Sequence, residues 1–204
     1  LTPPSIAGQE IYKWKLNTPI KSTSSSDAFG NVCNILVQES PYTSMIIEAE
    51  GEVQTQDAFE FADDVKAVSP YYLLQQTHLT EPTEEMLEYF SGSLPKKNSI
   101  DELLKLAAAI QKAIKYSPGQ TNFASTAAQS FAMKSGVCQD HAHIMLGLCR
   151  ASSIPARYVS GYFFAEESPN LASHAWIDFC SNIHRVKLKP FHVFLEYSLD
   201  KLFY

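Results

Sequence analysis

A cysteine in the second half of the chain, Cys138, has the setting of a nucleophile. Gly136 precedes it and favours a turn, and apolar residues such as Ile144 and Leu148 then recur at helical spacing. This spacing predicts a helix that begins at or next to Cys138 and runs to about residue 153. The unpaired backbone N–H groups and the positive dipole end of a helix N-terminus favour negative charge. A thiol placed there is biased toward the nucleophilic thiolate, and the same N–H groups can stabilise an oxyanion.

A partner for this thiol lies downstream, in residues 172–179. This segment is rich in β-branched and aromatic residues and is predicted to be a strand, on which His174, Trp176 and Asp178 share one face. An imidazole can take the proton of Cys138 and later return it to a leaving group. Asp178 is two same-face steps from His174, roughly 13 Å along the strand. We therefore interpret Asp178 as a solvated or edge charge and Trp176 as a core residue.

Three blocks occur in order: Ser-Gly-Val-Cys-Gln-Asp-His-Ala-His at 135–143, Ile-Pro-Ala-Arg-Tyr-Val-Ser-Gly-Tyr at 154–162, and Ser-His-Ala-Trp at 173–176. In order and spacing they resemble the bacterial transglutaminase-like superfamily, whose core is similar to papain and whose members include proposed cysteine proteases and amidases. The resemblance implies that Cys138 is the nucleophile and His174 the base of acyl transfer on amide bonds of a protein or peptide, through a thioester. It implies no metal and no organic cofactor. Water or an amine could resolve the thioester.

The resemblance also implies a third catalytic residue, an Asp on the strand after the histidine strand. Residues 179–199 contain no Asp, and Glu196 is their only acidic residue. Three explanations stay open. The tail from about residue 180 is a divergent strand pair in which Asp200 or another acceptor orients His174, or it is a truncated or frame-altered end, or the protein is a degenerate member that serves as a binding or scaffold protein.

Two histidines near the predicted nucleophile raise a metal-binding alternative. Cys138 and His141 are three residues apart and can share a helix face, and His143 and Cys149 are further candidate ligands. The sequence has no CxxC and no HExxH pattern, which disfavours a metal site. We expect ordinary helix histidines and a core Cys149.

The second block supplies the strand that precedes the histidine strand, predicted at residues 157–164. Arg157 is expected to anchor structure through its fork of donors. Tyr158 and Tyr162 either line the cleft or pack on the sheet, and packing is the favoured interpretation.

Composition disfavours several classes of function. The 204 residues carry a net charge of −6, which argues against nucleic-acid and anionic-membrane partners. No apolar run approaches the ~20 residues of a membrane span, and the first residues show no signal-peptide pattern. The four cysteines form no dense framework, so we expect reduced thiols in the cytoplasm and no Cys33–Cys180 disulfide. The oligomeric state is not predicted.

The chain is expected to belong to the α+β class and to have two parts. Residues 1–60 are predicted to form a small β-sandwich module, similar to the module that precedes the core in bacterial family members but lacking its first strand. Residues 61–79 are predicted to be a linker. Residues 80–204 are expected to form the papain-like, transglutaminase-like core, with helices packed on an antiparallel sheet.

Local signals place the elements of the module. Strands are predicted at 11–16, 32–37 and 44–53, where β-branched and aromatic residues concentrate, with Gly51 as a bulge. Residues 27–31 contain Gly and Asn and are predicted to form a turn.

Capping signals place the helices of the core. Thr80 is expected to cap the first of them. Ser99 with Glu102 and Thr126 with Gln129 have the spacing of capping boxes at the starts of the next two.

Overall fold

The computed structural model describes residues 2–5, 9–55, 68–162, 173–180 and 188–189. The chain divides into two compact units, Leu1–Val68 and Ser69–Tyr204. The boundary lies inside the predicted linker, of which residues 61–67 are outside the described part. Among the helices of the described residues, none has both the length and the apolar character needed to cross a bilayer.

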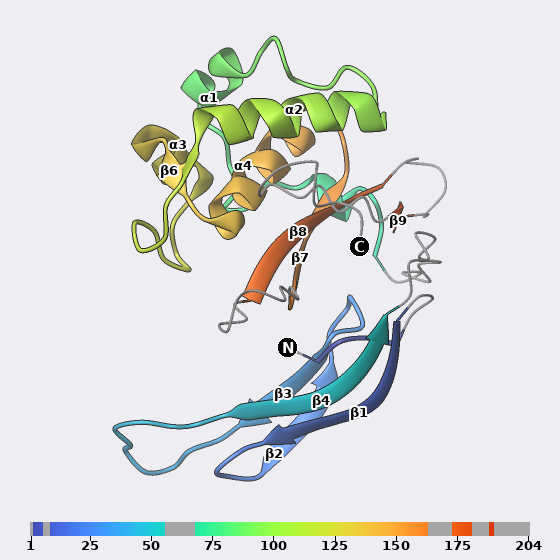
Figure 1. Ribbon diagram of the computed structural model, residues 1–204, viewed down its shortest axis with the longest axis vertical. Helices are drawn as coiled ribbons and strands as arrows, with labels where there is room; N and C mark the ends of the chain where they lie inside the picture. Colours follow the sequence, from blue (N-terminus) through green and yellow to red (C-terminus); the bar gives the residue numbers. More distant parts are fainter. Residues whose placement is uncertain (1, 6–8, 56–67, 163–172, 181–187, 190–204) are drawn as a thin grey trace. The chain divides into compact units, whose positions relative to one another are not determined.

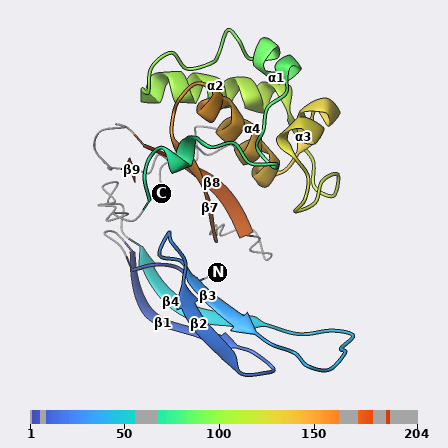
Figure 2. The ribbon, with the colours of Figure 1, turned by 180° about the vertical axis from the view of Figure 1, so that it is seen from behind.

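The first unit contains two antiparallel strand pairs (Figures 1 and 2). β1 (Gln9–Asn17) pairs with β4 (Glu48–Thr55), and β2 (Ser22–Ser26) pairs with β3 (Val32–Leu36). None of the described side chains between residues 9 and 55 is buried. These strands therefore enclose no core of the kind that holds a sandwich together, and the predicted β-sandwich is not confirmed.

The predicted turn between β2 and β3 is confirmed. Asp27 Oδ1 accepts the backbone N–H groups of Phe29 at 2.8 Å and Asn31 at 2.9 Å. Gly30 has φ of +80°, a conformation that glycine adopts without steric cost.

The predicted bulge at Gly51 is wrong. The β1–β4 register shifts on the other strand, between Ile11 and Lys13. Gly51 pairs with Trp14, and a Cβ at Gly51 would overlap the Trp14 ring. The glycine is thus explained by the close approach of the indole.

The second unit mixes helices with short strands. In chain order its elements are η1 (Tyr72–Leu74), α1 (Glu84–Tyr89), α2 (Ile100–Ala113), β5 (Lys115–Tyr116), α3 (Ala127–Met133), β6 (Ser135–Gly136), α4 (Cys138–Ala151), β7 (Ala156–Tyr162), β8 (Ser173–Cys180) and β9 (Leu188–Lys189). The predicted α+β class is confirmed for this unit.

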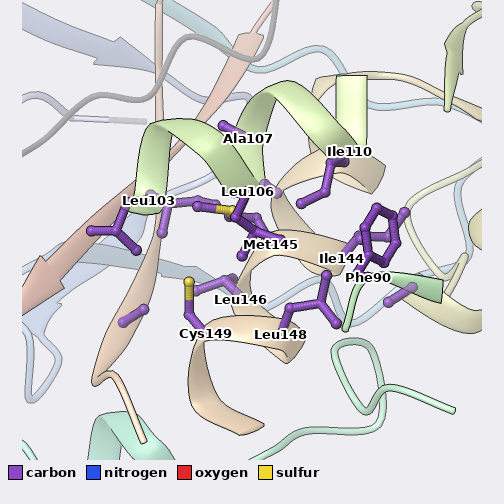
Figure 3. Packing of buried hydrophobic residues seen from close by; sticks show 14 of the residues in the cluster. Phe90, Leu103, Leu106, Ala107, Ile110, Ile144, Met145, Leu146, Leu148 and Cys149 are labelled. Carbon is purple, nitrogen blue, oxygen red and sulfur yellow. The ribbon is translucent and has the colours of Figure 1, made fainter. Parts of the chain in front are cut away.

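Helix α4 is the centre of the unit. Every residue from 140 to 149 is buried, so the helix is enclosed on all sides rather than along the single stripe that its apolar spacing suggested. Helices α2 and α3 pack on it, and β7 and β8 pack on it from the opposite side to α2 (Figure 1). In Figure 3 the side chains of Leu106 and Ile110 on α2 point toward Met145 and Ile144 on α4. The ends of α4 are consequently its only accessible parts.

Helix α2 begins where the sequence predicted but is capped differently. Ser99 is the N-cap residue, yet its side chain makes no cap hydrogen bond. Glu102 instead accepts the backbone N–H groups of Lys96 and of Lys97, the latter at 2.9 Å. Its carboxylate therefore holds the incoming loop rather than the N-cap residue, and the predicted capping box is wrong.

The other two helix starts give one confirmation and one correction. The Thr126–Gln129 capping box is present, with both reciprocal bonds formed at the start of α3. Helix α1 is capped by Thr83, whose hydroxyl accepts the N–H of Met86 at 3.2 Å. The predicted cap, Thr80, is buried in the turn before this helix.

Strands β7, β8 and β9 form an antiparallel sheet in that order. The side chains of Ala175, Ile177 and Phe179 on β8 join the hydrophobic cluster around α4. Because side chains alternate along a strand, His174, Trp176 and Asp178 belong to the other face of β8. One face of β8 thus packs against the core, and the other face bears His174, Trp176 and Asp178.

The segment before α1 closes over α4 at Gly147. Gln76 Nε2 donates to the Gly147 carbonyl at 2.8 Å, and Arg150 Nη1 donates to Thr80 Oγ1 at 3.0 Å. A Cβ at Gly147 would overlap the Thr80 carbonyl oxygen. Only glycine leaves room for this backbone approach.

We expect Gly147→Ala to lower the free energy of unfolding by roughly 1–3 kcal/mol, because the overlap outweighs the higher helix propensity of alanine. Urea denaturation monitored by circular dichroism measures the change. Gly92→Ala is the matched control, since a Cβ at Gly92 meets no atom within 4 Å, and its effect should stay within about 0.5 kcal/mol. Equal effects of the two substitutions would contradict the proposed close approach.

Candidate active site

Cys138 is the first residue of α4, as the sequence predicted. Val137 is the N-cap residue, in extended conformation, and the helix runs from Cys138 to Ala151. The thiol is half-buried and packs against the edge of the hydrophobic cluster. It therefore lies in the field of the N-terminal dipole of a long, buried helix, which favours the thiolate.

A buried carboxylate holds this helix start in place. Asp140 is fully buried, and its Oδ2 accepts the N–H of Val137 at 2.7 Å and the hydroxyl of Thr121 at 2.6 Å. Its Oδ1 accepts the hydroxyl of Ser130 at 2.7 Å. The N-cap residue, Val137, has no side-chain acceptor for the N–H groups of the helix. The side-chain capping bond between Val137 and Asp140 is therefore the one that the Asp140 carboxylate accepts from the Val137 N–H. Three segments, the 121 loop, α3 and the turn before Cys138, thus meet on one carboxylate.

Gly136 is the residue that lets Asp140 come so close. A Cβ at Gly136 would lie 2.5 Å from the Asp140 Cβ and 2.7 Å from its Oδ2. The glycine before the cysteine therefore makes room for the carboxylate, in addition to the turn that the sequence suggested.

His141 ties the first turn of α4 to the end of α2. It is buried, with Nδ1 2.9 Å from the Val137 carbonyl oxygen and Nε2 3.2 Å from the Ile114 carbonyl oxygen. Both partners only accept hydrogen bonds. Within the described residues, no group of three His, Cys, Asp or Glu side chains is arranged to hold a metal ion.

His143 lies deeper in the same helix and packs on β7. Its ring centroid is 5.6 Å from that of Tyr158. Burial lowers the pKa of His143, while the Ser125 carbonyl that it bonds and the nearby Asp140 oppose this shift. Its Nδ1 is buried and has no hydrogen-bond partner among the described residues. His141 and His143, expected to be ordinary helix histidines, are both buried in the structure.

Tyr158 on β7 shares with Cys138 the hydrophobic cluster against which both residues pack. It is half-buried. Burial raises the pKa of Tyr158, and the nearby charges of Cys138 and Asp140 raise it further, against the effect of a Ser160 hydrogen bond. Packing on the sheet is confirmed for Tyr158, whereas Tyr162 is 49% exposed.

His174 lies near the start of β8, where it pairs across the sheet with Gly161. It is half-buried, and its ring meets that of Trp176 edge-on, with centroids 4.7 Å apart and planes at 65°. Trp176 is buried, in agreement with its predicted core role. Both His174 and Cys138 belong to the second unit, in which β8 packs against α4. The reaction between thiol and imidazole stays a prediction.

The interpretation of Asp178 as a solvated or edge charge is wrong. The residue is 3% exposed, and its Oδ2 accepts from Arg157 Nε at 3.0 Å and Nη2 at 2.8 Å. Arg157 and Asp178 are directly opposed in the β7–β8 ladder. The predicted anchoring role of Arg157 is confirmed, and its partner is the carboxylate that sequence reasoning had placed in solvent.

The third catalytic residue remains a prediction. Asp200 lies outside the described residues, as does most of the tail from residue 181 on. The exception is β9, which pairs antiparallel with β8 so that Lys189 opposes Phe179 and Leu188 opposes Cys180. A third strand therefore does follow the histidine strand, at the end of β8 away from His174.

The family is decided by a match over residues 88–190, just over half of the chain, to the family model described as Transglutaminase-like superfamily. This chain belongs to the transglutaminase-like superfamily. The match contains both Cys138 and His174. It begins in α1 and ends just past β9, so the family pattern extends beyond Trp176, where the third sequence block ends.

One solved structure and several curated sequences are similar to this transglutaminase-like chain. A crystal structure described as "a Putative Cysteine Protease from Cytophaga hutchinsonii" has a TM-score of 0.63 at 21% identity, covering 89% of this chain and 66% of that chain. An uncharacterised Mycobacterium leprae protein is 27% identical over 199 residues, 87% of this chain and 70% of its own. An uncharacterised Mycobacterium tuberculosis protein is 33% identical over 104 residues, 47% of this chain. The chain spans only 33% of that last relative's length.

Sequence reasoning missed two parts of this transglutaminase-like site. The Asp140 network was missed, although an acid at the third helical position is a known capping signal. The contact of Tyr158 with the surroundings of Cys138 had no local signal, because it depends on how β7 packs on α4.

We expect Asp140→Asn to lower the free energy of unfolding by roughly 1–3 kcal/mol, because an amide nitrogen would face hydrogen-bond donors at a fully buried position. Asp101→Asn is the matched control, an exposed acid in the first turn of α2. Its loss should be below about 1 kcal/mol. Chemical denaturation at pH 7 compares the two, and similar losses would argue against the buried network.

The lowered pKa of His143 gives a pH dependence of stability. Below pH ~6.5 the unfolded chain binds a proton at this residue that the folded chain does not, so the free energy of unfolding falls as the pH decreases. The slope from this residue is at most about 1.4 kcal/mol per pH unit. We expect His143→Gln, whose side chain is polar but does not titrate, to remove this part of the slope in denaturation series from pH 7 to 5. The exposed His78→Gln is the control, and an unchanged slope in His143→Gln would contradict the assignment.

Proposed function

We propose that this protein catalyses thiol-dependent acyl transfer on amide bonds of protein or peptide substrates, with Cys138 as nucleophile and His174 as general base. The observation that carries the proposal is the position of Cys138. Its thiol is half-buried at the first residue of α4, and the buried Asp140 fastens that helix start. Membership of the transglutaminase-like superfamily supports the same assignment.

The proposed reaction has two stages. The Cys138 thiolate attacks the amide carbonyl carbon, the C–N bond breaks, and the imidazolium of His174 protonates the departing amine, which leaves an acyl thioester. Water then adds to the thioester while His174 takes its proton, and the acid is released as the thiol reforms. The backbone N–H of Cys138, at the open end of the helix, donates to the oxyanion in both stages.

Water is proposed as the acyl acceptor ahead of an amine. The support is indirect: the fold neighbour from Cytophaga hutchinsonii is described as "a Putative Cysteine Protease". A non-catalytic binding or scaffold role is the second candidate. It is favoured by the lack of an Asp between residues 179 and 199, where the family places the residue that orients the imidazole.

Site-resolved alkylation separates the enzyme from the scaffold. We expect iodoacetamide at pH 7 to label Cys138 at least about tenfold faster than the exposed thiol of Cys33, because the activated cysteine is largely thiolate. Peptide mass spectrometry gives the rate at each cysteine. In His174→Ala the rate at Cys138 should fall toward that of Cys33. Burial raises the pKa of Cys149, so this thiol should label only in unfolded protein.

A second readout follows the acyl group itself. With p-nitrophenyl acetate we expect a burst of nitrophenol and a transient acetyl group on Cys138, both absent in Cys138→Ser. Incorporation of dansylcadaverine into casein would identify an amine as the acceptor. Labelling of Cys138 no faster than that of Cys33, together with no burst, would exclude the enzyme and favour the scaffold.

A further inference from the structure

The indole of Trp176, on β8, lies over Gly161 of the neighbouring strand β7, where the glycine has no side chain. Trp176 pairs with Val159, and the adjacent pair on the same face is His174 with Gly161. A Cβ at Gly161 would lie 2.8 Å from Trp176 Cζ3 and 3.4 Å from its Cη2. The ring therefore lies diagonally over Gly161, in the space that any other residue opposite His174 would fill.

In this position over Gly161, the indole of Trp176 contacts the imidazole of His174. The ring centroids of His174 and Trp176 are 4.7 Å apart with planes at 65°, the edge-to-face arrangement that aromatic rings prefer. Trp176 is only 9% exposed, whereas His174 is half-buried. A large buried ring with few rotamers thus limits the orientations open to a smaller ring at the surface.

An acid–base histidine works only when its ring is held in one orientation toward its partners. Gly161 is the penultimate residue of the second sequence block, 154–162, and Trp176 is the last residue of the third, so the contact joins the two blocks through tertiary structure. The contact involves two strands, because Trp176 lies on β8 with His174 and Gly161 lies on β7. It does not depend on any residue of the tail.

We propose that Trp176, seated over Gly161, is a positioning residue that holds the imidazole of His174. Its effect on turnover rests on the proposed function, but the ring contact does not. A test therefore needs one readout of the contact and another of turnover.

Tryptophan fluorescence reads the contact without catalysis. The chain has two tryptophans, so Trp14→Phe leaves Trp176 as the single emitter. A protonated imidazole in contact with an indole quenches its emission. We expect the emission of Trp176 to fall as the pH decreases from about 8 to 5, the range in which histidines take up a proton. The step should vanish in His174→Gln and persist in His78→Gln. The difference between wild type and His174→Gln gives the same signal if Trp14→Phe does not fold.

The rate of p-nitrophenyl acetate hydrolysis measures the effect of the contact on turnover. Gly161→Ala displaces the indole, so we expect kcat to fall about tenfold with KM changed less than about twofold, together with a weaker fluorescence step. Trp176→Leu should resemble it, and Trp176→Phe should recover most of kcat because a phenyl ring can keep the edge contact. Gly92→Ala, where a Cβ meets no atom within 4 Å, should match wild type. Circular dichroism confirms that each variant is folded.

The outcomes separate the two proposals. A pH-independent emission of Trp176, or a step that survives in His174→Gln, overturns the ring contact. A His174-dependent step with normal kcat in folded Gly161→Ala overturns the positioning role. A step that weakens in Gly161→Ala, in a protein that shows neither alkylation bias nor ester burst, supports the positioning contact and refutes the proposed function.

Discussion

The carboxylate of Asp140 is the constraint on which the site depends. It is fully buried and accepts hydrogen bonds from Val137, Thr121 and Ser130, which belong to three different segments. A buried charge is costly unless it is satisfied in this way, so the three segments are locked together as a condition of folding. The turn before Cys138 is consequently tied to α3 and to the 121 loop. Gly136 permits this arrangement because any side chain there would displace the carboxylate.

Strand β8 keeps stability and chemistry on separate faces. Ala175 and Ile177 belong to the cluster around α4, whereas His174 and Trp176 alternate to the other face. The pairing of Arg157 with Asp178 resists a slip between β7 and β8, and a slip of one residue would exchange the two faces. The register that this pair favours is the one that puts Gly161 opposite His174.

The second unit places several polar groups where a purely structural core would have apolar ones. Asp140, His141, His143 and Asp178 are all buried, and one atom each of His143 and Asp178 has no hydrogen-bond partner among the described residues. Such groups lower stability unless they are satisfied, and they concentrate at functional sites. Asp140 and His141 lie in the first turn of α4 and are hydrogen-bonded, whereas the two atoms without a partner belong to His143, deeper in α4, and to Asp178 on β8.

Local sequence patterns predicted four elements correctly: the start of α4 at Cys138, the strand of His174, the Asp27 turn and the Thr126 capping box. Each depends on residues close together in the chain, where periodicity and capping chemistry act directly. Three other features became visible only in the folded structure. Asp178 is buried against Arg157, Glu102 accepts hydrogen bonds from the loop before α2, and α4 is enclosed on all sides. Those outcomes depend on which distant segment supplies the partner. Residue type and spacing cannot specify that, because burial and pairing are properties of the packed chain.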